Sequence, residues 1–307
     1  MHALSGFVDL QVNGYADVDF NADELDDDRV AGVCRRLIDD GVAGILATVV
    51  TANLPVMCRR LANIVRVREA DSVIAAMIWG IHIEGPFLNA TPGYIGAHPA
   101  EFARDANVDS MKQLLDAAGG LARLVTLAPE RDAGARVIQW LVSQGIRVSA
   151  GHCDPTIDQL REAIDAGLSL FTHLGNACPA MLPRHDNIIQ RVLSLADQLH
   201  VGFIADGIHV PYVALGNYLR ICGFDQAFVV TDAISGAGLG PGEYRLGNRV
   251  VVVDENLATW AADRSHLVGS AGTMQRSAEN LQKELRLNER QIHQLLIDNP
   301  RGILSRP

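Results

Sequence analysis

Three segments of the 307-residue chain that read as buried strands end in residues able to bind a metal ion. The run "WGIHIE" ends in Glu84, "SAGH" ends in His152, and "LFTH" ends in His173. An ionised carboxylate in apolar surroundings is costly unless it is paired or bound to a cation. A glutamate with two histidines is a common ligand set for a catalytic divalent ion, usually zinc. The pattern therefore predicts a metal site, although each histidine alone is more often structural and an arginine partner for Glu84 is an alternative.

A fourth candidate is Asp232, which ends the run "QAFVVTD". It could simply cap the following loop, which is a common structural role for aspartate. It could also be a general base, because a carboxylate within hydrogen-bond reach of an attacking water can take its proton. The two lysines, Lys112 and Lys283, both lie in amphipathic helix patterns. They exclude Schiff-base chemistry, which needs a buried lysine, and a phosphate-binding GK[ST] loop.

Eight β-rich runs separated by helical patterns must position these residues. The runs are "GFVDLQV", "GILATVV", "MIWGIHIE", "LARLVTLA", "GIRVSA", "LSLFTH", "LHVGFIA" and "QAFVVTD". Between them apolar residues recur with helical spacing, and several of these segments end in glycine. The alternation predicts an α/β fold, a (β/α)8 barrel of the TIM type, with a doubly wound open sheet as the alternative. In such a barrel the chemistry lies at the carboxyl ends of the strands.

The composition limits the partners and the location. A net charge of −10 argues against nucleic acid and anionic membranes as partners. No apolar run approaches the roughly 18 residues that a membrane span needs, and the first residues do not resemble a signal peptide. The five cysteines are odd in number and scattered, which predicts reduced thiols and a cytoplasmic location.

Seven motifs together resemble one family. In order they are "GFVDLQVNG", "HIEGPFLN", "TLAPE", "SAGHCD", "THLGNA", "IADGIHV" and "VTDA". This series resembles N-acetylglucosamine-6-phosphate deacetylases of the amidohydrolase superfamily, from Gly6 to "NPRGIL" near the end. The resemblance implies metal-dependent hydrolysis of the N-acetyl group of N-acetylglucosamine-6-phosphate, or of a close amino-sugar phosphate, to the amine and acetate.

The resemblance also implies roles for particular residues. Glu84, His152 and His173 would bind the metal. Asp232 would activate the water and then protonate the departing amine, and His98 in "IGAHP" would stabilise the oxyanion.

For the sugar phosphate, the resemblance implies binding by Asn176, the Ala177 backbone and His209. Arg184 stands where the family has an arginine that reaches the phosphate of the neighbouring subunit, which implies a homodimer. A guanidinium suits this task because its fork of donors matches phosphate.

One divalent ion per chain is expected. Many amidohydrolases bind a second metal through an HxH motif on the first strand, where this chain has Gln11 and Asn13. Neutral amides are poor zinc ligands. The fourth strand, "ARLVTLAPE", also lacks a lysine that could bridge two metals. Zinc is the expected ion, and iron, manganese and cobalt suit the same ligands.

The chain departs from the family pattern in two respects. Family members usually carry a small β-sandwich built from segments before and after the barrel. Here the sequence starts at the first strand and stops with the closing helices, which predicts one barrel domain over residues 1–307. Around the sugar pocket, Ile95 replaces a usual basic residue. These changes leave two alternatives: an amidohydrolase acting on another N-acyl or cyclic amide, or a non-catalytic sugar-phosphate-binding barrel.

Overall fold

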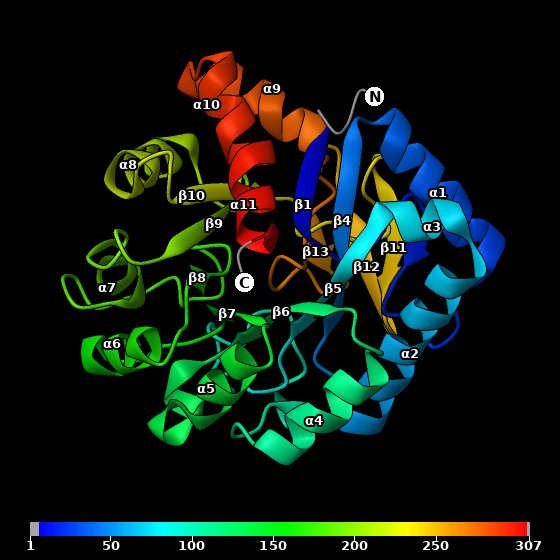
Figure 1. The fold of residues 1–307 in the computed structure, drawn as a ribbon. Coiled ribbons are helices and arrows are strands. Elements are labelled where there is room, and N and C mark those ends of the chain that lie inside the picture. Colours follow the sequence, from blue (N-terminus) through cyan, green and yellow to red (C-terminus); the bar gives the residue numbers. More distant parts are fainter. Residues whose placement is uncertain (1–5, 306–307) are drawn as a thin grey trace.

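The computed structural model describes residues 6–305, and its centre is a sheet of eight parallel strands. Each strand pairs with the next one along the chain, so the sheet curls into a nearly closed barrel (Figure 1). The strands are β1 (Phe7–Val12), β4 (Val42–Val50), β5 (Ile78–Glu84), β6 (Ala122–Leu127), β7 (Arg147–Ala150), β8 (Leu170–Phe171), β9 (His200–Ile204) and β10 (Ala227–Val230). The predicted (β/α)8 barrel is confirmed.

Helices surround the strands on the outside of the barrel (Figure 1). They are α1 (Asp27–Asp39), α2 (Leu54–Ala70), α3 (Ser72–Met77), α4 (Val108–Ala117), α5 (Arg136–Ser143), α6 (Ile157–Asp165), α7 (Ile188–Leu193) and α8 (Tyr212–Cys222). Several begin at a side-chain cap, such as Asn53 before α2 and Thr156 before α6, which satisfies backbone N–H groups that lack a helical partner. None of the helices within residues 6–305 is long and apolar enough to cross a bilayer.

Backbone and side-chain contacts together close the seam between the first and last strands. Val12 forms an isolated bridge with Ala233. Below it, the Asp9 carboxylate accepts hydrogen bonds from the Thr231 hydroxyl at 2.6 Å and the Thr231 backbone N–H at 3.2 Å. These contacts bring Asp232 next to the residues that follow β1.

The inside of the barrel is layered. An apolar cluster fills one end, and Ile303 of α11 (Asn299–Ser305) packs against it; in Figure 1, α11 lies beside β1 and β10. A polar layer follows, in which His82 Nε2 lies 2.8 Å from the Thr126 hydroxyl. Hydroxyl contacts of 2.8 Å and 2.7 Å continue from Thr126 through Thr172 to Ser149. Because side chains alternate along a strand, Glu84 lies on the same face as His82, beyond this polar layer.

Beyond β10 the chain forms a small antiparallel sheet that the sequence analysis did not predict. Its strands are β11 (Gly242–Leu246), β12 (Arg249–Val253) and β13 (Thr259–Ala261). A second small ribbon joins β2 (Gly14–Tyr15) and β3 (Val18–Asp19). The chain then ends in α9 (Met274–Leu285), α10 (Glu289–His293), a π-helical turn (Gln294–Asp298) and α11. The assignment of residues 1–307 to one domain stays a prediction.

Candidate active site

Glu84, at the end of β5, is surrounded by imidazoles. Its side chain is 3% exposed, and the Nε2 atoms of His152 and His173 each lie 3.3 Å from its Oε1. His98 Nε2 lies 3.7 Å from the other oxygen, Oε2. The three residues predicted as metal ligands therefore come together, because the carboxyl ends of the parallel strands meet at one rim of the barrel.

His98 also lies close enough to Glu84 to be considered as a ligand. One ligand atom from each of Glu84, His98 and His152 lies within 4.8 Å of the others, which makes these three a possible cation site on distance alone. The hydrogen bonds of each ring, rather than the distances, separate a metal ligand from a proton donor.

The hydrogen bonds of His152 fit a metal ligand. Its Nδ1 lies 3.1 Å from the Tyr94 carbonyl oxygen and 3.2 Å from that of Ile95. Carbonyl oxygens only accept, so Nδ1 carries the proton and a neutral ring has a lone pair on Nε2. That lone pair faces the Glu84 carboxylate, which is also an acceptor. Two acceptors facing each other need a positive charge between them, and a divalent ion bound by both satisfies this need.

The hydrogen bonds of His98 fit a proton donor instead. The backbone N–H of Thr51 donates to its Nδ1 at 3.3 Å, so the ring proton is on Nε2. Burial lowers the pKa of His98 well below its usual value, and the neighbouring His152 lowers it further. A neutral ring with Nε2–H directed towards the site can donate to a developing oxyanion.

Asp232 lies beside Glu84 and is held by two amides. Gln11 Nε2 is 3.0 Å from both Asp232 Oδ1 and Glu84 Oε1, and Asn13 Nδ2 is 2.7 Å from Asp232 Oδ1. Burial raises the pKa of Asp232, and the charge of Glu84 raises it further, while the hydrogen bond from Asn13 lowers it. Gln11 and Asn13 thus act as hydrogen-bond donors to the two carboxylates.

Three of these residues have a left-handed backbone conformation. The φ angles are 51° at His152, 33° at His173 and 53° at Asp232. Residues other than glycine rarely adopt such values, and the strain costs on the order of 1–3 kcal/mol per residue. Each of these residues follows the end of a strand. Each was also predicted from the sequence to bind the metal or to act as the base.

These residues open into a cavity of about 690 Å³, a usual size for a small-molecule site. Asn176, Ala177 and His209, predicted to hold the sugar phosphate, line this cavity. Arg184 is exposed and does not line it. The structure thus brings all the predicted catalytic, metal-binding and same-chain phosphate residues to one site, and leaves Arg184 outside it.

Comparison with known proteins gives the family. No family model matches the chain. N-acetylglucosamine-6-phosphate deacetylase from Mus musculus is 38% identical over 281 residues, which cover 88% of this chain and 66% of the mouse protein. The enzyme from Lysinibacillus sphaericus is 31% identical over 281 residues, covering 91% of this chain and 70% of that protein. The chain belongs to the N-acetylglucosamine-6-phosphate deacetylase family.

Solved structures of the family have the same fold. N-acetyl-D-glucosamine-6-phosphate deacetylase from Mycobacterium smegmatis superposes with a TM-score of 0.88 at 29% identity, over 98% of this chain and 77% of that chain. That structure is an aspartate-to-alanine mutant in complex with N-acetyl-D-glucosamine-6-phosphate. The Pasteurella multocida deacetylase gives a TM-score of 0.83 at 27% identity. The chain spans 66% of the length of the mouse and bovine relatives.

The small sheet forms one wall of the active-site cavity, which the sequence did not predict. Leu246, Arg249 and Trp260 of the small sheet line it, followed by His266 and Leu267. The sequence did contain a signal for this sheet. Gly247 and Asn248 form a two-residue hairpin turn between β11, which contains Tyr244, and β12, which contains four consecutive valines.

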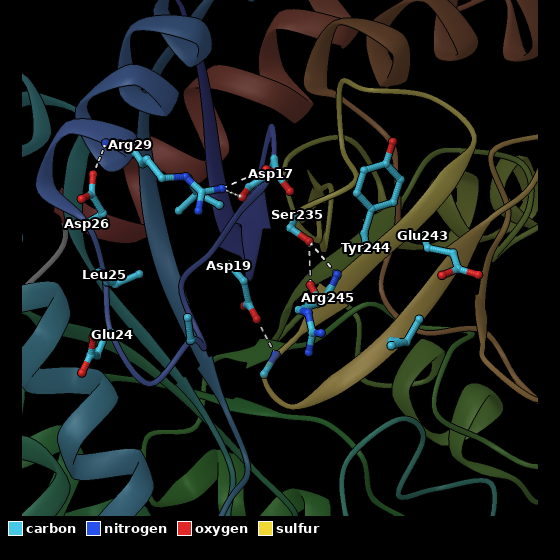
Figure 2. Close-up of a pocket in the computed structure, with 14 residues that line it drawn as sticks. Asp17, Asp19, Glu24, Leu25, Asp26, Arg29, Ser235, Glu243, Tyr244 and Arg245 are labelled. Carbon is cyan, nitrogen blue, oxygen red and sulfur yellow. Dashed lines mark hydrogen bonds and ion pairs between the residues drawn. The ribbon is translucent and has the colours of Figure 1, made fainter.

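A second cavity, of about 810 Å³, lies at the other face of the small sheet (Figure 2). Several of its charged groups have partners within the chain. Arg29 is paired with Asp17 at 2.9 Å, and Asp19 accepts hydrogen bonds from the backbone N–H groups of Asn21 and Gly247. The charged side chains of Glu24, Glu243 and Arg245 are exposed to solvent, so nothing in this cavity points to a particular ligand.

Proposed function

We propose that the chain hydrolyses the N-acetyl group of N-acetylglucosamine-6-phosphate to the free amine and acetate. The observation that carries this proposal is the buried Glu84 carboxylate, which has His152, His173 and His98 around it and Asp232 beside it. The family membership supports the same reaction.

Glu84, His152 and His173 would hold one divalent ion, and we propose zinc. When bound, such an ion polarises the acetyl carbonyl and makes water a better nucleophile. Membership of the deacetylase family supports a bound metal ion. The facing hydrogen-bond acceptors of Glu84 and His152 support it as well.

Asp232 is the proposed general base. Its Oδ1 already accepts hydrogen bonds from Gln11 and Asn13, so Oδ2 is the oxygen available to take a proton from the attacking water. Asp232 then gives this proton to the nitrogen of the departing amine. His98 donates its Nε2–H to the carbonyl oxygen as negative charge develops there.

The phosphate is proposed to bind at Asn176, the Ala177 backbone and His209. His209 Nδ1 lies 2.6 Å from Asp206 Oδ2, which fixes the ring and leaves Nε2 for a phosphate oxygen. Burial raises the pKa of Asp206, but the hydrogen bond and charge of His209 outweigh this effect and hold the pKa below its usual value.

We further propose a homodimer in which Arg184 reaches the phosphate in the neighbouring active site. Arg184 lies between β8 and α7, three residues after Met181, which is 92% exposed. Within residues 6–305 the exposed Arg184 guanidinium has no hydrogen-bond or ion-pair partner, which leaves it available to a second copy of the chain. A cytoplasmic location is also proposed, in keeping with five free cysteines.

The decisive test is a comparison of N-acetylglucosamine with its 6-phosphate. We expect kcat/KM to be higher for the 6-phosphate by a factor of about 100 or more, because a charge-assisted phosphate site contributes several kcal/mol. Release of free amine measures both rates. Equal rates for the two sugars would contradict the phosphate site, and no release from either would contradict the proposed reaction.

A further inference from the structure

The small sheet places one fixed positive charge at the active-site cavity. Leu246 of β11 and Arg249 of β12 line this cavity, whereas their neighbours Arg245 and Val250 line the second cavity. This is the alternation expected of strand residues, and Figure 2 shows Arg245 among the side chains that line the second cavity. The sheet therefore separates the two cavities and contributes Arg249 to the active-site cavity.

Arg249 binds the loop that carries His98. Its Nη1 donates a hydrogen bond to the carbonyl oxygen of Ala97, the residue directly before His98. The Ala97 side chain packs against the apolar cluster that includes Leu246 and Val251 of the small sheet. Ala97 is thus held to the sheet by a polar contact and an apolar one.

Nearby carboxylates partly offset the burial of the Arg249 charge. Burial lowers the pKa of Arg249 and the nearby Arg60 lowers it further, while the charges of Asp19 and Glu101 raise it. A guanidinium stays protonated in such surroundings. Because it already has a carbonyl partner and nearby carboxylates, Arg249 is suited to hold the loop in place rather than to capture an anion.

The loop itself needs such a restraint. It contains two glycines in the left-handed region, Gly93 with φ 91° and Gly96 with φ 57°. Its backbone hydrogen bonds are those of turns, such as the His98 N–H to the Ile95 carbonyl at 3.2 Å. The position of the His98 ring consequently depends on Thr51 on the barrel side and on Arg249 on the small-sheet side.

We propose that Arg249 is a positioning residue, which sets the place of the proton-donating His98 ring by holding the Ala97 carbonyl. This inference rests on the proposed function, in which His98 stabilises the oxyanion. It makes the small sheet a working part of the active site, although no residue of that sheet would take part in proton transfer.

Kinetics of Arg249→Met test the proposal. We expect kcat to fall about 10-fold to 100-fold with KM within about threefold of wild type, because a displaced donor weakens only the transition state. Arg249→Lys should recover part of the loss, since it keeps a donor and a charge. Arg245→Met, which changes the other face of the same sheet, is the matched control and should leave both constants unchanged.

A double variant identifies the group through which Arg249 acts. In a His98→Gln background, Arg249→Met should cost no more than about twofold in kcat, because the ring that it positions is gone. If Arg249 instead binds the phosphate, KM rises and the loss persists in the His98→Gln background. That outcome would overturn the proposal.

Hydrogen exchange provides a readout that needs no turnover. Amides of residues 93–98 should exchange faster in Arg249→Met than in wild type, and no faster in Arg245→Met. Equal exchange in all three proteins would overturn the loop contact. If the wild type fails to release amine from the 6-phosphate, the proposed function fails, and the exchange result still decides whether Arg249 holds this loop.

Discussion

Replacing Asp232 by asparagine isolates its role as a base. Asp232 Oδ1 accepts from Gln11 at 3.0 Å and from Asn13 at 2.7 Å. An asparagine can keep its oxygen in that position and place its NH₂ group where Oδ2 was. The shape of the site and both amide contacts are then preserved, while the negative charge and the proton acceptor are lost.

The expected kinetic cost follows from this loss. Removing a general base lowers kcat by about 10²-fold to 10⁴-fold, which corresponds to about 3–5 kcal/mol of transition-state stabilisation. The fold should not lose stability. Burial and the charge of Glu84 raise the pKa of Asp232, so its ionisation costs folding free energy as the pH rises above the usual aspartate range. At pH 8 the metal-free Asp232→Asn protein should therefore be at least as stable as wild type.

Three measurements together decide the matter. They are the release of free amine at pH 8, the metal content per chain, and urea unfolding of the metal-free proteins. Asp9→Asn is the matched control, because Asp9 is a buried aspartate of the same barrel whose carboxylate is bound to Thr231. An Asp232→Asn protein with full metal content and turnover within about threefold of wild type would show that another group is the base.

Further predictions concern the phosphate, the dimer, the metal and pH. His209→Ala should raise KM for the 6-phosphate about 10-fold or more, with little change for the unphosphorylated sugar. If the protein is a homodimer with shared sites, mixing and reassociating inactive Arg184→Ala and Asp232→Asn chains should restore about a quarter of wild-type activity. Half of the dimers would then contain both chains, and each of these would hold one intact site of its two. No recovery of activity would contradict shared sites. Chelation should lower Tm, added zinc should restore it, and two equally tight ions per chain would contradict a single-metal site. Burial raises the pKa of Asp9 to about 7, so ionising this carboxyl costs folding free energy. As the pH rises from 4 to 8, the wild type should therefore lose stability relative to Asp9→Asn, by roughly 4 kcal/mol at most. A pH-independent difference between their free energies of unfolding in urea would contradict this.

Much of the fold could be predicted because each strand carries its own local signal. Alternation within "GIHIE" places His82 and Glu84 on one face of β5, and the shared direction of parallel strands then brings Glu84, His152 and His173 to one rim. Even β8, reduced to Leu170–Phe171, still delivers His173 to that rim.

The remaining features depend on contacts between distant parts of the chain. Gln11 bridges Glu84 and Asp232, which follow it by 73 and 221 residues, and no local pattern encodes that double contact. Arg249 reaches Ala97 across a separation of 152 residues from a hairpin whose turn signal is only two residues long. Such contacts are set by tertiary packing, which periodicity and propensity do not describe.

The left-handed conformations of His152, His173 and Asp232 bear on whether the site is in use. Folding alone would favour glycine at each of these positions, because glycine adopts positive φ without steric cost. Each of the three positions instead carries an imidazole or a carboxylate, the side chains that the proposed hydrolysis uses, so the backbone strain coincides with the proposed chemistry.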